Sequence, residues 1–158
     1  MPLASVEEML RYGGPDSPAG VALAFKAMGL AFSVITPTAH PKRRRVDIDT
    51  ASRGPGARHG FELVTRCTTE GRYEVNARLE RPERGVALEQ FVFRLVLRAI
   101  GDALPPGGAG DRGVHRDGRN PDRTPADEDR YMSLKQAMAD GLMAQPADAV
   151  FELDPAKA

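Results

Sequence analysis

The residues best suited to chemistry lie in one stretch, His59-Gly-Phe-Glu-Leu-Val-Thr-Arg-Cys67, which contains the only cysteine of the chain. One cysteine cannot form an internal disulfide. A single thiol with a histidine and a glutamate close by in sequence could be a metal ligand, a nucleophile or a small buried apolar residue. These three roles imply very different proteins.

The apolar spacing of this stretch predicts an amphipathic helix over about residues 57–70. On one helix His59 and Cys67 would lie about 12 Å apart along the axis, at roughly 1.5 Å per residue, and could not touch. We therefore expect His59 to be a polar residue at the helix start, unless the preceding loop folds it back or the two residues meet across a subunit boundary. Glu62 and Arg66 are spaced i,i+4, which predicts a surface ion pair.

Two roles remain open for Cys67. It is either an inert buried residue, or a thiolate that faces a pocket beside the N-terminus of another helix, whose dipole would lower its pKa. Such a helix is predicted to begin at Pro18, with Ser17 as its N-cap. Its free amides follow Gly14 and are a suitable place for an anion. The predicted ligand-binding residues are Gly14, Ser17, Pro18, Glu62 and Cys67.

Other segments also have helical patterns. Ser5 and Glu8 form a capping-box pattern that starts a short helix, which ends before Gly13. Residues 17–32 are apolar on nearly all sides, as in a helix buried in a core. A last helix begins after Thr124. Its predicted buried stripe consists of Tyr131, Leu134, Met138 and Leu142.

The strand candidates complete an α+β pattern. Residues 44–50 and 72–79 alternate between apolar and polar, and residues 91–97 are apolar enough for a central strand. Residues 150–153 predict a short extended end. We expect a single domain of helices packed on a mainly antiparallel sheet. A long flexible loop over residues 101–123 is either functional or disordered.

Composition excludes several partners. The formal net charge is zero, so nothing global attracts the chain to nucleic acid or an anionic membrane. Residues 42–45 are basic, but no aromatic stacking platform accompanies them, which favours a solvated strand entry. The N-terminus has no signal-peptide pattern, and we expect no apolar run near the roughly 18 residues of a spanning helix. The sequence predicts a cytoplasmic protein that binds neither nucleic acid nor a membrane, in agreement with its single cysteine.

Three blocks, in this order, resemble the E-subunit family of formylmethanofuran dehydrogenase. Residues 17–26, Ser-Pro-Ala-Gly-Val-Ala-Leu-Ala-Phe-Lys, resemble its Cys-Pro-Gly-x-Ala-Leu-Gly-Tyr-Arg helix entry. Residues 59–68 resemble its Asp-Ala-Ile-Gln-x-x-Thr-Gly-Cys-Thr helix. Residues 123–152 are similar to its closing helix and Pro-x-Glu-x-Phe-x-Val tail. The blocks cover nearly the whole chain except residues 101–120, and the resemblance implies a homodimer.

The departures from the family pattern concern its metal site. Typical members carry a His-Gly-His-x-Cys-Pro entry, which together with a later cysteine resembles a set of metal ligands. Here Ser17 stands in place of the first cysteine, no histidine precedes it, and His59 replaces the later aspartate. Only Cys67 is unchanged. One thiolate and one imidazole are fewer than the three or four protein ligands of zinc, so we expect that no metal site is retained.

These observations lead to three hypotheses. The first is an accessory protein that binds a small molecule or cofactor, of unknown identity, between the Ser17 and Cys67 helices. The second is a cysteine-dependent enzyme with Cys67 as thiolate, His59 as base and the Ser17 helix end as oxyanion site. The third is an interaction module that acts through the loop at 101–123. The chain has no phosphate-binding loop, nucleophile elbow or metalloprotease motif.

Overall fold

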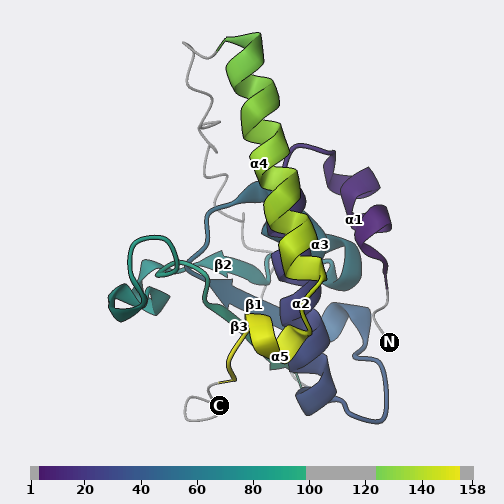
Figure 1. Cartoon of the computed structure of the whole chain (residues 1–158). Coiled ribbons are helices and arrows are strands. Elements are labelled where there is room, and N and C mark those ends of the chain that lie inside the picture. The colour runs from purple at the N-terminus through teal and green to yellow at the C-terminus, as the bar shows by residue number, and fades with distance from the viewer. Residues whose placement is uncertain (1–3, 99–123, 154–158) are drawn as a thin grey trace.

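Helices pack beside a small three-stranded sheet in the computed structural model, which describes residues 4–98 and 124–153 (Figure 1). The predicted α+β class is confirmed. The loop predicted at 101–123 lies outside the described residues. The helices are α1 (Val6–Gly13), α2 (Pro18–Ile35), α3 (Pro55–Thr65), α4 (Pro125–Met143) and α5 (Ala147–Val150). The strands are β1 (Val46–Thr50), β2 (Tyr73–Val75) and β3 (Phe93–Leu97).

The sheet is mixed, so the prediction of a mainly antiparallel sheet is wrong. Its order is β2-β1-β3, with Ile48 opposite Tyr73 in a parallel pair and opposite Leu95 in an antiparallel pair. Strands β1 and β2 pair in parallel because α3 lies between them in the chain. This helix returns the chain to the end of the sheet at which β1 begins, so β2 runs in the same direction as β1. The central strand is therefore β1, and β3 is an edge strand, so the expectation that residues 91–97 form a central strand is wrong. The strand predicted over 72–79 stops at Val75, where Asn76 accepts a hydrogen bond from the Arg78 amide and begins a 3₁₀ turn.

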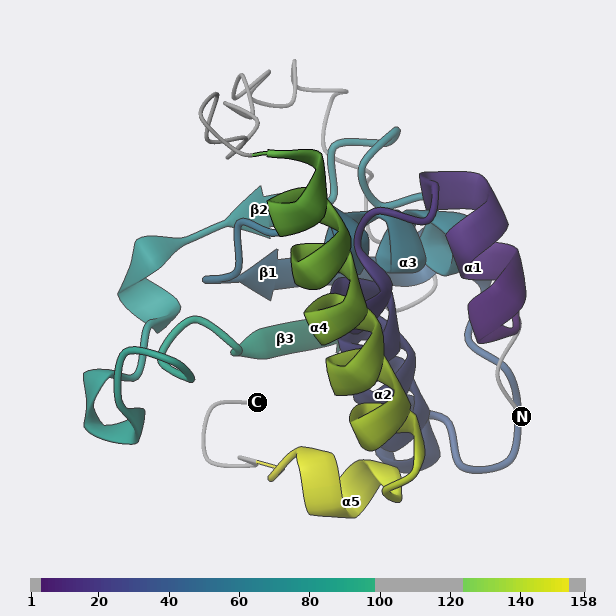
Figure 2. The same ribbon diagram turned by 45° about the horizontal axis from the view of Figure 1, so that its top comes forward.

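Helix α2 lies between α3 and α4 (Figures 1 and 2). Small residues allow α2 and α3 to approach closely. A Cβ added at Gly60 would lie 2.8 Å from the Cβ of Ala24, and one added at Gly56 would lie 2.7 Å from the Cβ of Ser17. Both distances are shorter than real side chains tolerate, so the packing of these two helices depends on glycine.

The core is built on this pair of helices. Phe61 of α3 packs against Phe93 of β3 with ring centroids 5.3 Å apart, and Phe93 meets Phe151 at 5.7 Å. Phe151 follows the single turn of α5 and has extended backbone, but residues 150–153 form no strand. The buried apolar core also includes Met9, Val21, Ala24, Met28, Val46, Ile48, Val64 and Cys67.

Helix α4 begins as predicted but buries a different face. Thr124 and Asp127 form a capping box at its start. The predicted buried stripe is wrong for Tyr131, Leu134 and Met138, which are 39%, 62% and 45% exposed, whereas Leu142 is half-buried. The helix instead buries Ala139. Half-buried neighbours of Ala139 on that face are Met132, Lys135 and Met143.

Two lysines set the orientation of α4. Lys26 of α2 donates to the carbonyls of Met143, at 3.3 Å, and Gln145. Lys135 donates to the carbonyl of Asp16 at 2.8 Å. Because these bonds hold one side of α4 toward α2, the predicted stripe is turned toward solvent, and the first turns of α4 project past the other described elements (Figure 1).

Helix α2 is longer and more apolar than we expected from the sequence. Its 18 residues have a mean hydropathy of 1.7, so the prediction that no run approaches the length and composition of a membrane-spanning helix is wrong. In this structure 44% of the helix is buried, and it packs on both α3 and α4. The core helix of a soluble protein meets the same length and composition criteria. The predicted capping box of α1, formed by Ser5 and Glu8, is confirmed.

The close approach of α2 and α3 is testable with Gly60→Val. We expect this change to lower the free energy of unfolding by about 1–3 kcal/mol, because the new methyl groups overlap Ala24. Urea unfolding followed by circular dichroism measures it. Gly141→Val in α4 is the matched control, since a Cβ there meets no atom within 4 Å. Equal effects of the two substitutions would contradict the close packing.

Candidate functional site

Cys67 does not lie on a helix. Helix α3 ends at Thr65, and Arg66 adopts the left-handed conformation, with a φ of 54°. The prediction that this helix continues to residue 70 is therefore wrong. The cause is Glu62, whose carboxylate accepts hydrogen bonds from the amides of Thr68, at 2.7 Å, and Thr69, at 3.1 Å. These bonds turn the chain out of the helix.

Glu62 has a different role from the one predicted. It is only 6% exposed, so the predicted surface pair with Arg66 is wrong. Besides the two loop amides, its carboxylate accepts a bond from the Thr69 hydroxyl. A buried carboxylate needs such partners, and three donors of one loop supply them. The role of Glu62 in this structure is to hold the loop that carries Cys67.

The thiol of Cys67 is fully buried in the core, with no exposed surface. Burial is the main cause that raises its pKa to about 11, and the nearby Glu62 carboxylate raises it further. Contacts with Thr65 and Thr68 lower the pKa but do not offset burial. A thiol in this state is neutral near pH 7 and a poor nucleophile. The environment favours the inert, buried role for Cys67.

The structure does not bring Ser17 and Cys67 together. Ser17 lies against Gly56 in the first turn of α3, whereas Cys67 follows Thr65, the last residue of that helix. From Gly56 to Thr65 the helix axis extends about 14 Å, at roughly 1.5 Å per residue. Ser17 makes no side-chain capping bond.

The other residues predicted at this helix entry also lack a shared pocket with Cys67. Pro18 occupies the first position of α2 and is buried. Gly14 follows α1 with a φ of 86°, a conformation that favours glycine. Their positions fit a tight connection between α1 and α2.

His59 and Glu62 do line a common hollow. It has a volume of about 260 Å³. His59 packs under α1, where a Cβ added at Gly13 would lie 2.6 Å from Nδ1, and its ring meets that of Tyr12 edge-on at 6.4 Å. The loop residues Thr68 and Thr69 donate hydrogen bonds to the Glu62 carboxylate, and α1 covers His59. Both side chains therefore have a structural role in this part of the fold. The lining residues are Tyr12, Arg58, His59, Glu62, Thr68 and Thr69.

The residues that stand at the metal positions of the resembled family do not fit a metal. Ser17 and Cys67 lie at opposite ends of α3, and His59 is packed between α1 and α3. Within residues 4–98 and 124–153, no group of three or more histidine, cysteine, aspartate or glutamate side chains could hold a metal ion. Metal chemistry at this place is not supported by the side chains present.

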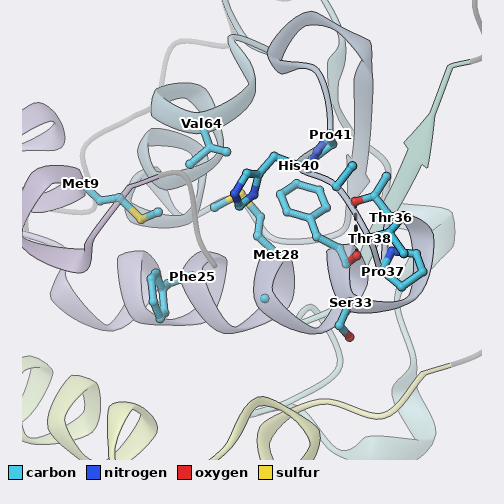
Figure 3. A pocket seen from close by; sticks show the side chains of 13 residues that line it. Met9, Phe25, Met28, Ser33, Thr36, Pro37, Thr38, His40, Pro41 and Val64 are labelled. Carbon is cyan, nitrogen blue, oxygen red and sulfur yellow. Dashed lines mark hydrogen bonds between the residues drawn. The ribbon is translucent and has the colours of Figure 1, made fainter.

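A larger cavity, of about 540 Å³, lies along the C-terminal half of α2 (Figure 3). We call it the α2 cavity. Met9 of α1 and Met28 of α2 are buried beneath it, and Val64 contributes from α3. The loop at 36–41 forms the opposite wall, from which His40 extends over the cavity on the side of Met28 and Val64 (Figure 3). The sequence did not indicate this cavity, because its lining comes from separate elements without a motif.

No charged side chain lines the α2 cavity among the described residues. Two of its hydroxyls already serve α2, since Ser33 donates to the Leu30 carbonyl at 2.7 Å and Thr36 to the Phe32 carbonyl at 3.3 Å. The full lining consists of Met9, Phe25, Met28, Gly29, Phe32, Ser33, Thr36, Pro37, Thr38, Ala39, His40, Pro41 and Val64.

Comparison of the chain with protein families, with curated proteins and with solved structures gave no match. The resemblance to the E-subunit family of formylmethanofuran dehydrogenase, and the homodimer that it implies, therefore remain predictions. The size and lining of the α2 cavity are the observations from which a function can be inferred.

Stability at high pH tests the environment of Cys67. The ordinary thiol pKa is 9.0 and burial raises it to about 11, so the unfolded state loses its proton first. Stability is fully present below pH 9 and falls as pH rises to 11. Wild type should lose about 2–3 kcal/mol more over this interval than Cys67→Ala. Urea unfolding at each pH measures the difference, and parallel curves for the two proteins would contradict the burial effect.

Alkylation tests the cysteine-enzyme alternative directly. At pH 8 we expect iodoacetamide to modify native Cys67 at least about 100-fold more slowly than the urea-unfolded chain, because the raised pKa leaves little thiolate. Mass spectrometry of timed samples gives both rates. If the native protein were modified as fast as the unfolded chain, the prediction would be contradicted and a catalytic role for Cys67 would be supported.

Proposed function

We propose that the protein binds a small apolar molecule in the α2 cavity and acts as an accessory binding protein. The observation that carries this proposal is the cavity itself, which has a volume of about 540 Å³, is open to solvent on one side and is lined mainly by apolar residues of α1, α2, α3 and the loop at 36–41. Ligand sites in proteins commonly have volumes of about 300–1,000 Å³ and mostly apolar walls with a few polar groups. The α2 cavity has both properties.

The walls combine rigid and adaptable parts. Pro37 and Pro41 restrict the loop, and Pro41 is buried at its end. Met28 has a flexible, polarisable side chain that adapts to the shape of a bound molecule, whereas Met9 is fully buried behind it. Water in the cavity meets these apolar surfaces, and a ligand that replaces it gains about 25 cal/mol for each Å² buried. Binding therefore has a physical driving force at this site.

The proposal keeps the small-molecule role predicted from the sequence but changes its place. The predicted pocket lay at the N-terminal end of α2, beside Ser17 and Cys67, whereas the α2 cavity lies along the C-terminal half of the helix. The lining offers one imidazole, of His40, and no thiol or carboxylate. This composition supports binding rather than catalysis. The interaction-module alternative depends on residues 101–123, which lie outside the described residues.

Gly29→Leu tests the proposal. Gly29 lines the cavity, and a Cβ there meets no atom within 4 Å, so the leucine fills the space without disturbing the helix. N-phenyl-1-naphthylamine is a suitable uncharged fluorescent probe, because the chain contains no tryptophan. We expect saturable binding to wild type and at least tenfold weaker binding to Gly29→Leu.

Gly141→Leu provides the matched control. It places the same side chain on α4 at a helical glycine with equally open surroundings, outside the cavity. We expect this variant to bind the probe like wild type, and both leucine variants to be at least as stable as wild type, since glycine weakens a helix interior. Equal binding by all three proteins would show that the probe lies elsewhere and would refute the proposed site.

A further inference from the structure

We infer that the molecule bound in the α2 cavity is an uncharged, planar aromatic compound with one hydroxyl or carbonyl group. The inference rests on the proposed function and adds the chemical class of the ligand. It follows from the charge of the lining, from the rings and the Met28 side chain that line the cavity, and from the hydrogen-bonding groups at its wall.

The charge of the surroundings favours an uncharged ligand. No charged side chain among the described residues lines the cavity, so a buried ionic group would lose its hydration without gaining a partner. The C-terminal ends of α2 and α3 face this region and carry partial negative charge. Arg43, two residues after the lining residue Pro41, donates to the Leu63 carbonyl at 2.7 Å and places a positive charge at the end of α3. These opposite charges leave no strong preference for either kind of ion.

The rings around the cavity favour an aromatic ligand. In the core, Phe61 pairs with both Tyr73 and Phe93. None of the ring contacts among the described residues involves Phe25, Phe32 or His40, although all three line the cavity. Phe25 and Phe32 are half-buried because they pack against the core, and His40 is exposed, so only the accessible part of each ring can contact a planar ligand.

One methionine adds to this preference. Met28, which is 3% exposed, lines the same cavity, and sulfur atoms make favourable contacts with aromatic rings, whereas Met9 is fully buried with its sulfur against Gly60. Ring–ring contacts also contribute beyond the burial of apolar area. An aliphatic molecule of equal size would gain the burial but neither of these contacts.

The polar groups of the lining suit one hydroxyl or carbonyl. The imidazole of His40 carries an N–H donor in either protonation state. The Thr38 hydroxyl lies in the same loop and is able to donate or accept. The hydroxyls of Ser33 and Thr36 donate to α2 carbonyls and retain only acceptor positions. A single polar substituent near the loop would therefore find a partner.

Calorimetric titration of the full chain at pH 7 with three compounds tests the inference. These are 2-naphthol, 2-naphthoate and decan-1-ol, each below its solubility or micelle limit. We expect 2-naphthol to bind at least tenfold more tightly than 2-naphthoate, which differs in its charge, and about threefold to tenfold more tightly than decan-1-ol.

The three outcomes that contradict us are distinct. Equal or tighter binding of 2-naphthoate would refute the uncharged class, and equal or tighter binding of decan-1-ol would refute the aromatic class. In both cases the proposed function would stand. If none of the three compounds binds, the proposed function itself fails.

Two variants of His40 test whether its ring contributes to the preference for an aromatic ligand. His40 is exposed in the loop, so its replacement leaves the core intact. With His40→Leu we expect the preference for 2-naphthol over decan-1-ol to fall by about twofold, because Phe25 and Phe32 remain, whereas His40→Phe should retain it because the ring is kept. A fall of the preference in both variants, or in neither, would overturn the role of this ring.

Discussion

The close contact between α2 and α3 is the constraint on which the rest of this structure depends. Gly60 lies against Ala24, and Gly56 against Ser17, at distances that exclude any larger side chain at either glycine. Helices in such close contact have little freedom to slide or rotate, because their backbones and not flexible side chains determine the spacing. The position of α3 then fixes where its end, the following loop and Cys67 are placed.

A second set of contacts determines what happens beyond the end of α3. Glu62 holds the loop amides of Thr68 and Thr69, and Arg72, which is also buried, donates to carbonyls of Val46 and Thr65. These groups join the end of α3 to the start of β1. Most of their hydrogen bonds are made within the fold, although Nε of Arg72 and the hydroxyl of Thr68 are buried without a partner among the described residues. The contacts around Cys67 therefore serve mainly to connect elements of the fold. The sequence pattern that drew attention to this region reflects its structural role.

The parts of the fold that were predictable are those that depend on nearby residues. The capping boxes at Ser5 and Thr124 act within one helical turn, and both are present. The end of α3 was not predictable, because Glu62 stops the helix by binding amides six and seven residues away. The face that α4 buries depends on Lys26, which binds the Met143 carbonyl across 117 positions of the chain. Sheet order is likewise a long-range property.

The candidate site escaped prediction for a related reason, and the contact between α2 and α3 explains its position. The small residues that allow close packing, Gly20 and Ala24, belong to the first half of α2. Beyond them the helix carries bulky side chains, with Met28 and Phe32 in place of glycine and alanine. The contacts of α3 advance along α2 from Gly20 to Ala24, and α3 ends at Thr65, so it does not reach the last turns of α2. The space that this leaves is covered by the loop at 36–41 and left partly empty, so the packing that stabilises the fold at one end of α2 produces the cavity at the other.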